Sequence, residues 1–178
     1  MKELALHILD VAENGITAGA DRICITVKQD PAQNRMEISI ADNGRGVPED
    51  VMNRITDPFY TTRTTRRVGL GLSLFENTAR RCGGSMTIDS EPGRGTRVTA
   101  TFVHDHIDRP PLGDMAGTLM TLIYSNPEGD IVYRYQSEGE EIVIDTKAVR
   151  EQFGNRPITD PQVFRHLMEK IKQIKTER

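Results

Sequence analysis

Several features that define large classes of protein are scarce or absent in this sequence. No stretch approaches the roughly 18 consecutive apolar residues of a membrane-spanning helix, and the first residues lack the long apolar core of a signal peptide. We therefore expect a cytoplasmic protein that does not contact a membrane. Cys24 lies in an apolar strand pattern and Cys82 at a helix end. Neither has metal-ligand or redox spacing, so both are expected to be buried and reduced.

Charge of one sign is not in large excess. The 178 residues include 23 Lys and Arg against 26 Asp and Glu, which gives a net charge of -3 without a long run of either sign. Proteins that bind nucleic acid through its phosphates usually concentrate positive charge, so no nucleic-acid partner is expected. The length suits a domain of about 100 to 150 residues with a smaller appendage.

The most informative stretch is a strand that ends in an acidic turn containing two glycines. Residues 36–40 alternate between apolar and polar side chains, which predicts a half-buried strand with Asp42 at its end. Gly44 and Gly46 leave the backbone of the turn bare and permit positive φ. A carboxylate beside bare backbone suits a planar ring that carries an amino donor. Taken alone, however, Asp-Asn-Gly-Arg-Gly is explained better as a hairpin turn.

Residues 2–18 have helical periodicity with a narrow polar stripe. The stripe consists of side chains spaced three or four residues apart: Glu3, His7, Asp10, Asn14 and Thr17. Apolar residues flank the stripe on both sides. It therefore points either into the protein or a cleft, or along the solvated edge of an ordinary amphipathic helix, and the helix alone does not decide between these alternatives. For His7, a structural hydrogen-bond partner is favoured over a contact with a ligand.

A second polar segment precedes another helix. Residues 57–68 are rich in hydroxyl and basic side chains, which indicates an exposed loop, and Gly69-Leu-Gly-Leu72 then opens an apolar-periodic helix. Glycines at a helix N-terminus expose N–H groups at the positive end of the helix dipole, where a phosphate chain binds favourably. Arginines of the loop, Arg63 among them, are placed to add charge-assisted contacts. By itself the Gly-x-Gly pattern is more common in turns and helix caps.

The order of elements predicts an α/β (α+β) two-layer sandwich, in which helices cover one face of a mixed β-sheet. Strands are expected at residues 23–27, 36–40, 86–88 and 96–103, and the last two are expected to complete the sheet. The prolines and glycine of Arg109–Gly113 mark a boundary between a domain at 1–106 and a small α+β module at 107–178.

The C-terminal module is expected to contain a helix, a hairpin and a second helix. These are predicted at Met115–Tyr124, at Ile131–Tyr135 with Glu141–Ile144 around Glu138-Gly139, and from a cap at Thr159-Asp-Pro161 to Lys175. About 70 residues form a marginal core alone, so we expect the module to pack on the first domain. Its sequence assigns no chemistry to it.

Five stretches occur in a fixed order along the first part of the chain: Asp10–Ala20, Asp42–Gly46, Asp57–Thr62, Gly69–Leu72 and Gly93–Thr96. In this order they resemble the motifs of the GHKL ATPases, whose histidine-kinase-like ATPase domain has the Bergerat fold. Residues 57–102 are especially similar to the catalytic domain of bacterial sensor histidine kinases. The resemblance covers about residues 1 to 104.

This resemblance implies a site for ATP and Mg2+. Asn14 would hold Mg2+ against the triphosphate, and Asp42 would accept a hydrogen bond from the adenine amino group. The remaining contacts implied by the resemblance are Gly44 and Gly46, which let the adenine approach, Thr96, which closes its side, Gly69, Leu70, Gly71 and Leu72, which cradle the phosphates, and Thr62 and Arg63 in a lid formed by Thr61–Arg67. Because the carboxylate needs a partner, adenine should be preferred to guanine.

Asp10 departs from the pattern of the superfamily. Hydrolysing members place a glutamate four residues before the asparagine as general base, whereas Asp10 is one methylene shorter. A displacement of about 1 Å can lower a rate on the order of a hundredfold. Asp10 is therefore the candidate catalytic residue, either through a second water or in a slow reaction.

The resemblance implies a stand-alone Mg-ATP-binding protein that acts in regulation. No phosphoacceptor helix pair precedes residue 1, so a complete histidine kinase is not expected. The leading expectation is a protein kinase acting in trans, or an ATP-dependent switch, on a protein partner that the sequence does not identify. The alternatives are a slow ATP hydrolase and a non-catalytic module gated by ATP or ADP.

Overall fold

The computed structural model describes residues 2–48 and 70–174. The loop expected at residues 57–68 lies outside these ranges. The described elements are, in chain order, α1 (Leu4–Thr17), β1 (Arg22–Asp30), η1 (Pro31–Gln33), β2 (Arg35–Asp42), α3 (Leu70–Arg81), β3 (Met86–Glu91), β4 (Gly95–Val103), α4 (Met115–Ser125), β5 (Asp130–Ser137), β6 (Glu140–Asp145), α5 (Thr146–Gln152) and α6 (Pro161–Ile171).

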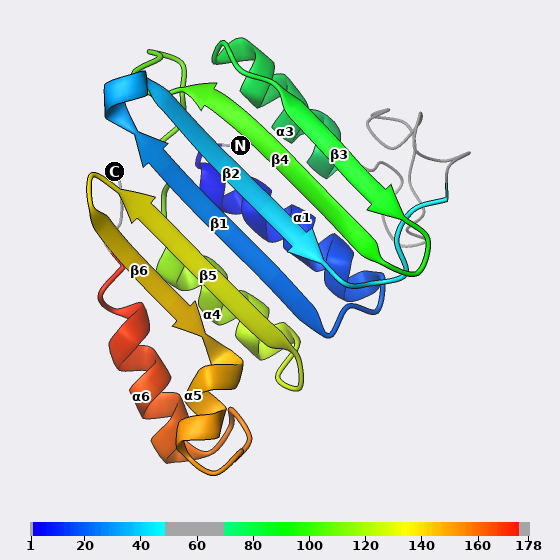
Figure 1. The fold of residues 1–178 in the computed structure, drawn as a ribbon, viewed down its shortest axis with the longest axis vertical. Helices are drawn as coiled ribbons and strands as arrows, with labels where there is room; N and C mark the ends of the chain where they lie inside the picture. The colour runs from blue at the N-terminus through cyan, green and yellow to red at the C-terminus, as the bar shows by residue number, and fades with distance from the viewer. Residues whose placement is uncertain (1, 49–69, 175–178) are drawn as a thin grey trace.

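The strands form one six-stranded sheet in the order β3-β4-β2-β1-β5-β6 (Figure 1). Neighbouring strands are antiparallel except β1 and β5, which are parallel, so the predicted mixed sheet is confirmed. The expectation that the strands near residues 86–103 complete the sheet is wrong, because β5 pairs with the free edge of β1 and β6 extends the sheet further. Alternation along a strand indicates its buried face and says nothing about the partner at its edge.

Helices cover one face of this sheet and leave the other to solvent, as the sequence predicted. In Figure 1, α1, α3 and α4 lie behind the strands. The residues of β1 and β2 that face these helices are apolar and at most 2 % exposed: Ile23, Ile25, Val27, Met36, Ile38 and Ile40. Burying an aliphatic side chain of this size stabilises the fold by about 1.5 to 3 kcal/mol. The architecture is therefore a two-layer α/β sandwich.

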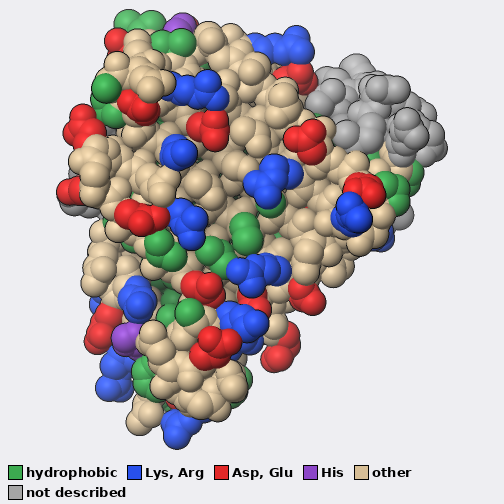
Figure 2. Space-filling model, viewed as in Figure 1, with side chains coloured by type: hydrophobic (Ala, Val, Ile, Leu, Met, Phe, Trp, Pro, Cys, Tyr) green, Lys and Arg blue, Asp and Glu red, His purple; other side chains and the backbone are tan. Residues whose placement is uncertain are grey.

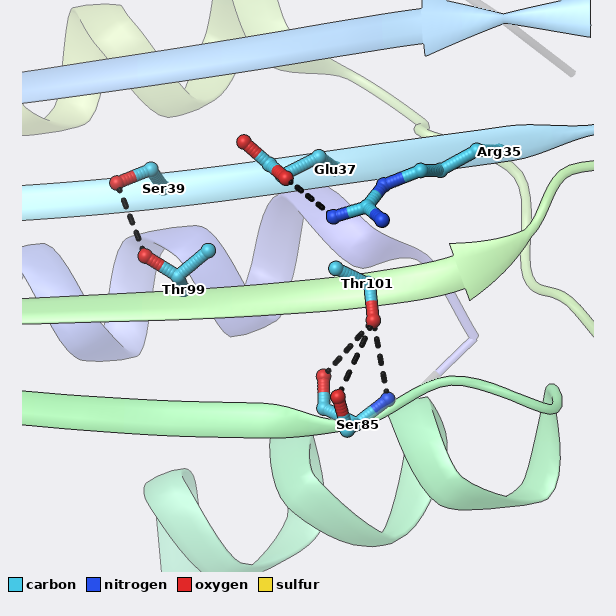
Figure 3. Close-up of polar contacts among 6 residues, drawn as sticks. All are labelled: Arg35, Glu37, Ser39, Ser85, Thr99 and Thr101. Carbon is cyan, nitrogen blue, oxygen red and sulfur yellow. Dashed lines mark hydrogen bonds and ion pairs between the residues drawn. The ribbon is translucent and has the colours of Figure 1, made fainter. Parts of the chain in front are cut away.

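The uncovered face of the sheet is polar. Figure 2 shows Lys and Arg side chains interspersed with Asp and Glu over this face. Its hydroxyl and charged side chains bond to one another within and between strands (Figure 3), as in the Arg35–Glu37 ion pair at 2.8 Å within β2 and the bond from Thr99 Oγ1 of β4 to Ser39 Oγ of β2 at 3.4 Å. Cys24 also lies on this face and is partly exposed, so its predicted burial is wrong, whereas Cys82 is buried as expected.

The segment after residue 107 caps the start of α1. The amides of Leu4 and Ala5 donate to the carbonyl oxygens of Pro111 and Leu112 at 3.0 and 2.8 Å, which satisfies two N–H groups that have no partner within the helix. Thr118 of α4 donates to the Ala5 carbonyl at 3.5 Å. The sheet also runs continuously into β5 and β6. The division into domains at residue 107 stays a prediction.

The elements expected in the C-terminal part are present. The first helix is α4, the hairpin is β5–β6, and Glu138 and Gly139 at its turn have positive φ values of 43° and 84°. The last helix, α6, begins with Asp160 accepting from the Gln162 amide at 2.9 Å and ends at Ile171, before the predicted Lys175. Helix α5 was not predicted. Within the two described ranges, no helix has the length and apolar character needed to cross a membrane.

Candidate functional site

Asp42 ends β2 on the face of the sheet that the helices cover. Its Oδ1 accepts a hydrogen bond from the Gly44 amide at 2.9 Å, and Thr96 of β4 is its partner on the adjacent strand. Burial raises the pKa of the Asp42 carboxyl above its ordinary value, and the backbone N–H groups of Gly44 and Thr96 offset part of this by stabilising the charged form. The protein therefore holds a half-buried acceptor here at a cost to its own stability.

We expect Asp42→Asn to raise the free energy of unfolding of the nucleotide-free protein at pH 7. A raised folded-state pKa means that the folded protein binds more protons than the unfolded chain, so stability is lost as pH rises from the ordinary value of 3.8 through the raised one. The gain in the free energy of unfolding of Asp42→Asn over wild type should disappear below pH 3.8. Urea unfolding from pH 3 to 8 measures it, with Asp89→Asn on the exposed side of β3 as control. A variant less stable than wild type at pH 7 would contradict this assignment of the pKa shift to burial.

Helix α1 passes unusually close to Asp42. A Cβ atom on Gly15 would lie 2.7 Å from the Asp42 Cβ and 2.9 Å from Ile23 Cδ1, so only glycine permits this approach. Gly15 was not predicted as part of the site. One feature of the sequence could have indicated it, namely a glycine inside a predicted helix. Glycine there lowers helix stability by about 1 kcal/mol relative to alanine, which suggests a packing or functional role.

The turn after Asp42 is held by the protein's own contacts. The Asn43 side chain accepts from the Arg22 amide at 2.9 Å and donates to Asp21 Oδ1 at 2.6 Å. A Cβ on Gly44 would lie 3.0 Å from Ala18, and one on Gly46, which has φ +70°, would lie 2.2 Å from the Glu91 carbonyl oxygen. Both predicted glycines are therefore required by the packing of the turn itself.

Ser90 connects this turn to β4 and was not predicted as part of the site. Its Oγ accepts from the Val47 amide at 2.8 Å, donates to the Gly95 carbonyl at 2.9 Å and lies 2.9 Å from Thr96 Oγ1. Because the single hydroxyl proton of Ser90 goes to Gly95, the Thr96 hydroxyl donates to Ser90. The Thr96 side chain is thus fixed beside Asp42.

The polar stripe of α1 divides into three environments. His7 is buried, Asp10 and Asn14 are half-buried one turn apart, and Thr17 is exposed, where it donates to the Glu13 carbonyl at 2.8 Å. The middle of the stripe is therefore partly buried, and Thr17 at its end lies on a solvated edge.

The start of α3 lies against Asp10. A Cβ on Gly71 would be 3.3 Å from the Asp10 Cβ and 3.5 Å from its Oδ2. Leu70, Gly71 and Leu72 form the first turn of α3, whose leading N–H groups have no partner within the helix. The structure thus brings predicted site residues to the two ends of one stretch of α1. These residues are Asp10, Asn14, Asp42, Gly44, Gly46, Thr96 and those in the first turn of α3. Thr62, Arg63 and Gly69 lie outside the described residues.

Two hollows open at opposite ends of the sheet. One, of about 520 Å3, is lined by Asp42, Ser90 and Thr96 among other residues. The other, of about 650 Å3, lies between the β1–β2 and β5–β6 turns, where charged side chains such as Lys28 and Glu138 line it. The larger hollow contains none of the predicted site residues, so the candidate site rests on chemistry and geometry rather than on size.

Comparison with known proteins finds matches to the N-terminal part of the chain, which contains the candidate site residues. The model of the family described as histidine kinase-, DNA gyrase B- and HSP90-like ATPase matches residues 2–106. Sporulation kinase D of Bacillus subtilis is 34% identical over 95 residues, which are 53% of this chain and 19% of that protein. Sensor protein kinase WalK of Staphylococcus aureus is 36% identical over 89 residues, 47% of this chain and 21% of that protein.

Sporulation kinase A of Bacillus subtilis is 29% identical over 102 residues, 57% of this chain and 16% of that protein. The chain thus spans about a fifth of the length of the curated relatives it matches. Among solved structures, full-length ShkA in complex with AMPPNP matches with a TM-score of 0.45 and 28% sequence identity. That match covers 54% of this chain and 20% of ShkA.

Proposed function

The chain belongs to the family of histidine kinase-, DNA gyrase B- and HSP90-like ATPases, and on that basis we propose that it is a regulatory protein that binds Mg-ATP and acts on a protein partner. The observation that carries the proposal is the half-buried Asp42, held at the end of β2 against Gly15 of α1. A carboxylate kept there at a cost to stability requires a functional reason. Accepting a hydrogen bond from the adenine amino group supplies one.

In this proposal the base lies at the Asp42 end of α1 and the phosphates at the Asp10 end. Asp42 accepts from adenine, Thr96 closes the side of the base, and the bare turn at Gly44 and Gly46 borders it. The contact of Gly15 with Asp42 and that of Asp10 with Gly71 support this arrangement. Five residues of helix separate the two contacts by about 7.5 Å along the axis.

The phosphates would meet the first turn of α3, where the helix dipole and leading N–H groups that have no partner within the helix favour negative charge. Asn14, half-buried one turn from Asp10, would give Mg2+ one oxygen ligand. Within residues 2–48 and 70–174, no three or more His, Cys, Asp or Glu side chains gather as a metal site. One amide oxygen nevertheless fits Mg2+, since this ion commonly takes one or two protein oxygens together with substrate phosphates and water. When bound, Mg2+ would neutralise charge that develops on the phosphates.

Phosphoryl transfer to a serine or histidine of a separate protein is the activity we favour. Transfer depends mainly on positioning and charge stabilisation, so it tolerates the short Asp10 carboxylate in place of a glutamate base. In the alternative, slow hydrolysis, Asp10 accepts the proton of a water that attacks the γ-phosphorus, and ADP leaves. The contact of Asp10 with Gly71 puts its carboxylate beside the first turn of α3, which suits either role. A non-catalytic switch gated by ATP is the third possibility.

Labelled ATP distinguishes these activities. We expect [γ-32P]ATP with the protein and a cell extract to label a protein partner and to release little free phosphate. Asp10→Ala should abolish whatever phosphate release wild type shows, whereas Glu13→Ala, a matched carboxylate on the same helix, should not. Unlabelled protein with rapid phosphate release would favour the hydrolase, and ATP binding with neither product would favour the switch. Phosphate release untouched by Asp10→Ala would exclude Asp10 as the base.

A further inference from the structure

His7 makes a set of contacts with α3 that the proposed nucleotide contacts do not use. The side chain lies on α1 one turn before Asp10 and is 0% exposed. Its ring stacks on Phe75 of α3, with ring centroids 5.1 Å apart and planes 18° apart. Its Nε2 lies 3.2 Å from Thr78 Oγ1, one further turn along α3. His7 thus makes a polar contact between the first half of α1 and the second half of α3.

The hydrogen bonds around Thr78 fix the tautomer of His7. The Thr78 hydroxyl donates its only proton to the Leu74 carbonyl at 2.8 Å, so its oxygen must accept from His7 Nε2–H. His7 Nδ1 is then an unprotonated acceptor, and it has no hydrogen-bond partner among the described residues. Burial lowers the pKa of His7 to about 4, which keeps the ring neutral at physiological pH. An apolar residue would fill the same space without a buried, unsatisfied nitrogen.

The order of the contacts along α1 and α3 shows the relative direction of the two helices. Asp10 touches Gly71 at the start of α3, whereas His7, earlier on α1, touches Phe75 and Thr78 later on α3. The helices are therefore antiparallel along this seam. Stacking on Phe75 sets their separation, while the directional bond to Thr78 resists rotation and sliding of α3, which apolar packing alone resists less well.

We propose that His7 is a positioning residue: through Phe75 and Thr78 it fixes α3 so that the first turn of that helix meets the phosphates bound beside Asp10 and Asn14. This inference rests on the proposed function. The base end of the site, at Asp42, lies at the other end of α1 and is held by separate contacts with Gly15 and Gly44. His7 should therefore influence the binding of the phosphates and leave the binding of the base alone.

The test compares Mg-ATP with adenosine in calorimetric titrations of the full chain. In His7→Phe, which keeps a ring against Phe75 but has no donor for Thr78, affinity for Mg-ATP should fall roughly five- to tenfold while adenosine affinity stays within about twofold. Thr78→Val should have the same effect. The double variant should lose no more than either single one. His7→Gln, which can place an amide N–H near the position of Nε2, should restore part of the ATP affinity.

Two controls separate positioning from folding. Thr121→Val removes from α4 a hydroxyl that also donates to the carbonyl four residues earlier, at 2.9 Å, and should leave both affinities unchanged. A purely structural role for His7 would lower both affinities by the same factor, as the folded fraction falls. That result, or an unchanged ratio of the two affinities in Thr78→Val, would overturn the inference while wild type still binds ATP. If wild type binds neither compound, the proposed function fails and this inference fails with it.

Discussion

Replacing Asp42 with alanine is expected to weaken ATP binding by roughly ten- to a hundredfold. A hydrogen bond to a charged group contributes about 1.5 to 3 kcal/mol, and each 1.4 kcal/mol corresponds to a factor of ten. The effect should be specific to the base, so wild type should prefer ATP to GTP and Asp42→Ala should lose that preference. Titration calorimetry with both nucleotides measures the four affinities.

The matched control for Asp42→Ala is Asp89→Ala. Asp89 lies on β3 at the same end of the sheet and lines the same hollow, but its side chain points to the exposed side. Its replacement should leave both nucleotide affinities within about twofold of wild type. If Asp42→Ala retained full ATP affinity and selectivity, Asp42 would have no part in recognising the base.

Gly95→Ala is expected to destabilise the protein by about 2 to 5 kcal/mol, the largest loss among the substitutions considered. Gly95 has φ +96°, and a Cβ on it would lie 2.0 Å from the Asp42 carbonyl oxygen and 2.8 Å from the Asn43 Cα. Backbone atoms cannot move aside without separating β4 from β2 at the position where Asp42 faces Thr96. The variant should therefore lose nucleotide affinity together with stability.

Gly93→Ala, in the same turn, measures the cost of backbone strain without a steric collision. Gly93 has φ +79°, but a Cβ on it would meet nothing within 4 Å. Only the conformational strain of a left-handed residue remains, which costs about 1 to 2 kcal/mol. Urea unfolding of the two variants and wild type gives both values. Equal losses in Gly93→Ala and Gly95→Ala would show that the collision with Asp42 is relieved by movement of the turn.

The local parts of the fold and site could be predicted from the sequence, because each has a short-range pattern. Alternation in residues 36–40 placed Asp42 at the end of a half-buried strand, and the Asp160-Pro161 pair marked the start of α6. Helical spacing collected Asp10 and Asn14 on one side of α1. The expected helix, strand and helix order then led to the two-layer sandwich that the structure has.

The parts that could not be predicted depend on contacts between distant segments. The pairing of β1 with β5 joins residues about 108 positions apart, as in Arg22 with Asp130, and no local pattern encodes it. Gly15 and Ser90 look ordinary in their own elements and acquire their roles only where α1 meets Asp42 and where β3 meets the turn at Val47. The capping of α1 by Pro111 and Leu112 is likewise visible only in three dimensions.

A crystal structure of the protein grown with Mg2+ and a non-hydrolysable ATP analogue would test the proposed site directly. We predict an adenine amino group within hydrogen-bond distance of the Asp42 carboxylate, Mg2+ at the Asn14 side chain, and phosphates at the first turn of α3. An analogue bound elsewhere, or an Asp42 carboxylate that faces only water while the nucleotide is present, would contradict this prediction.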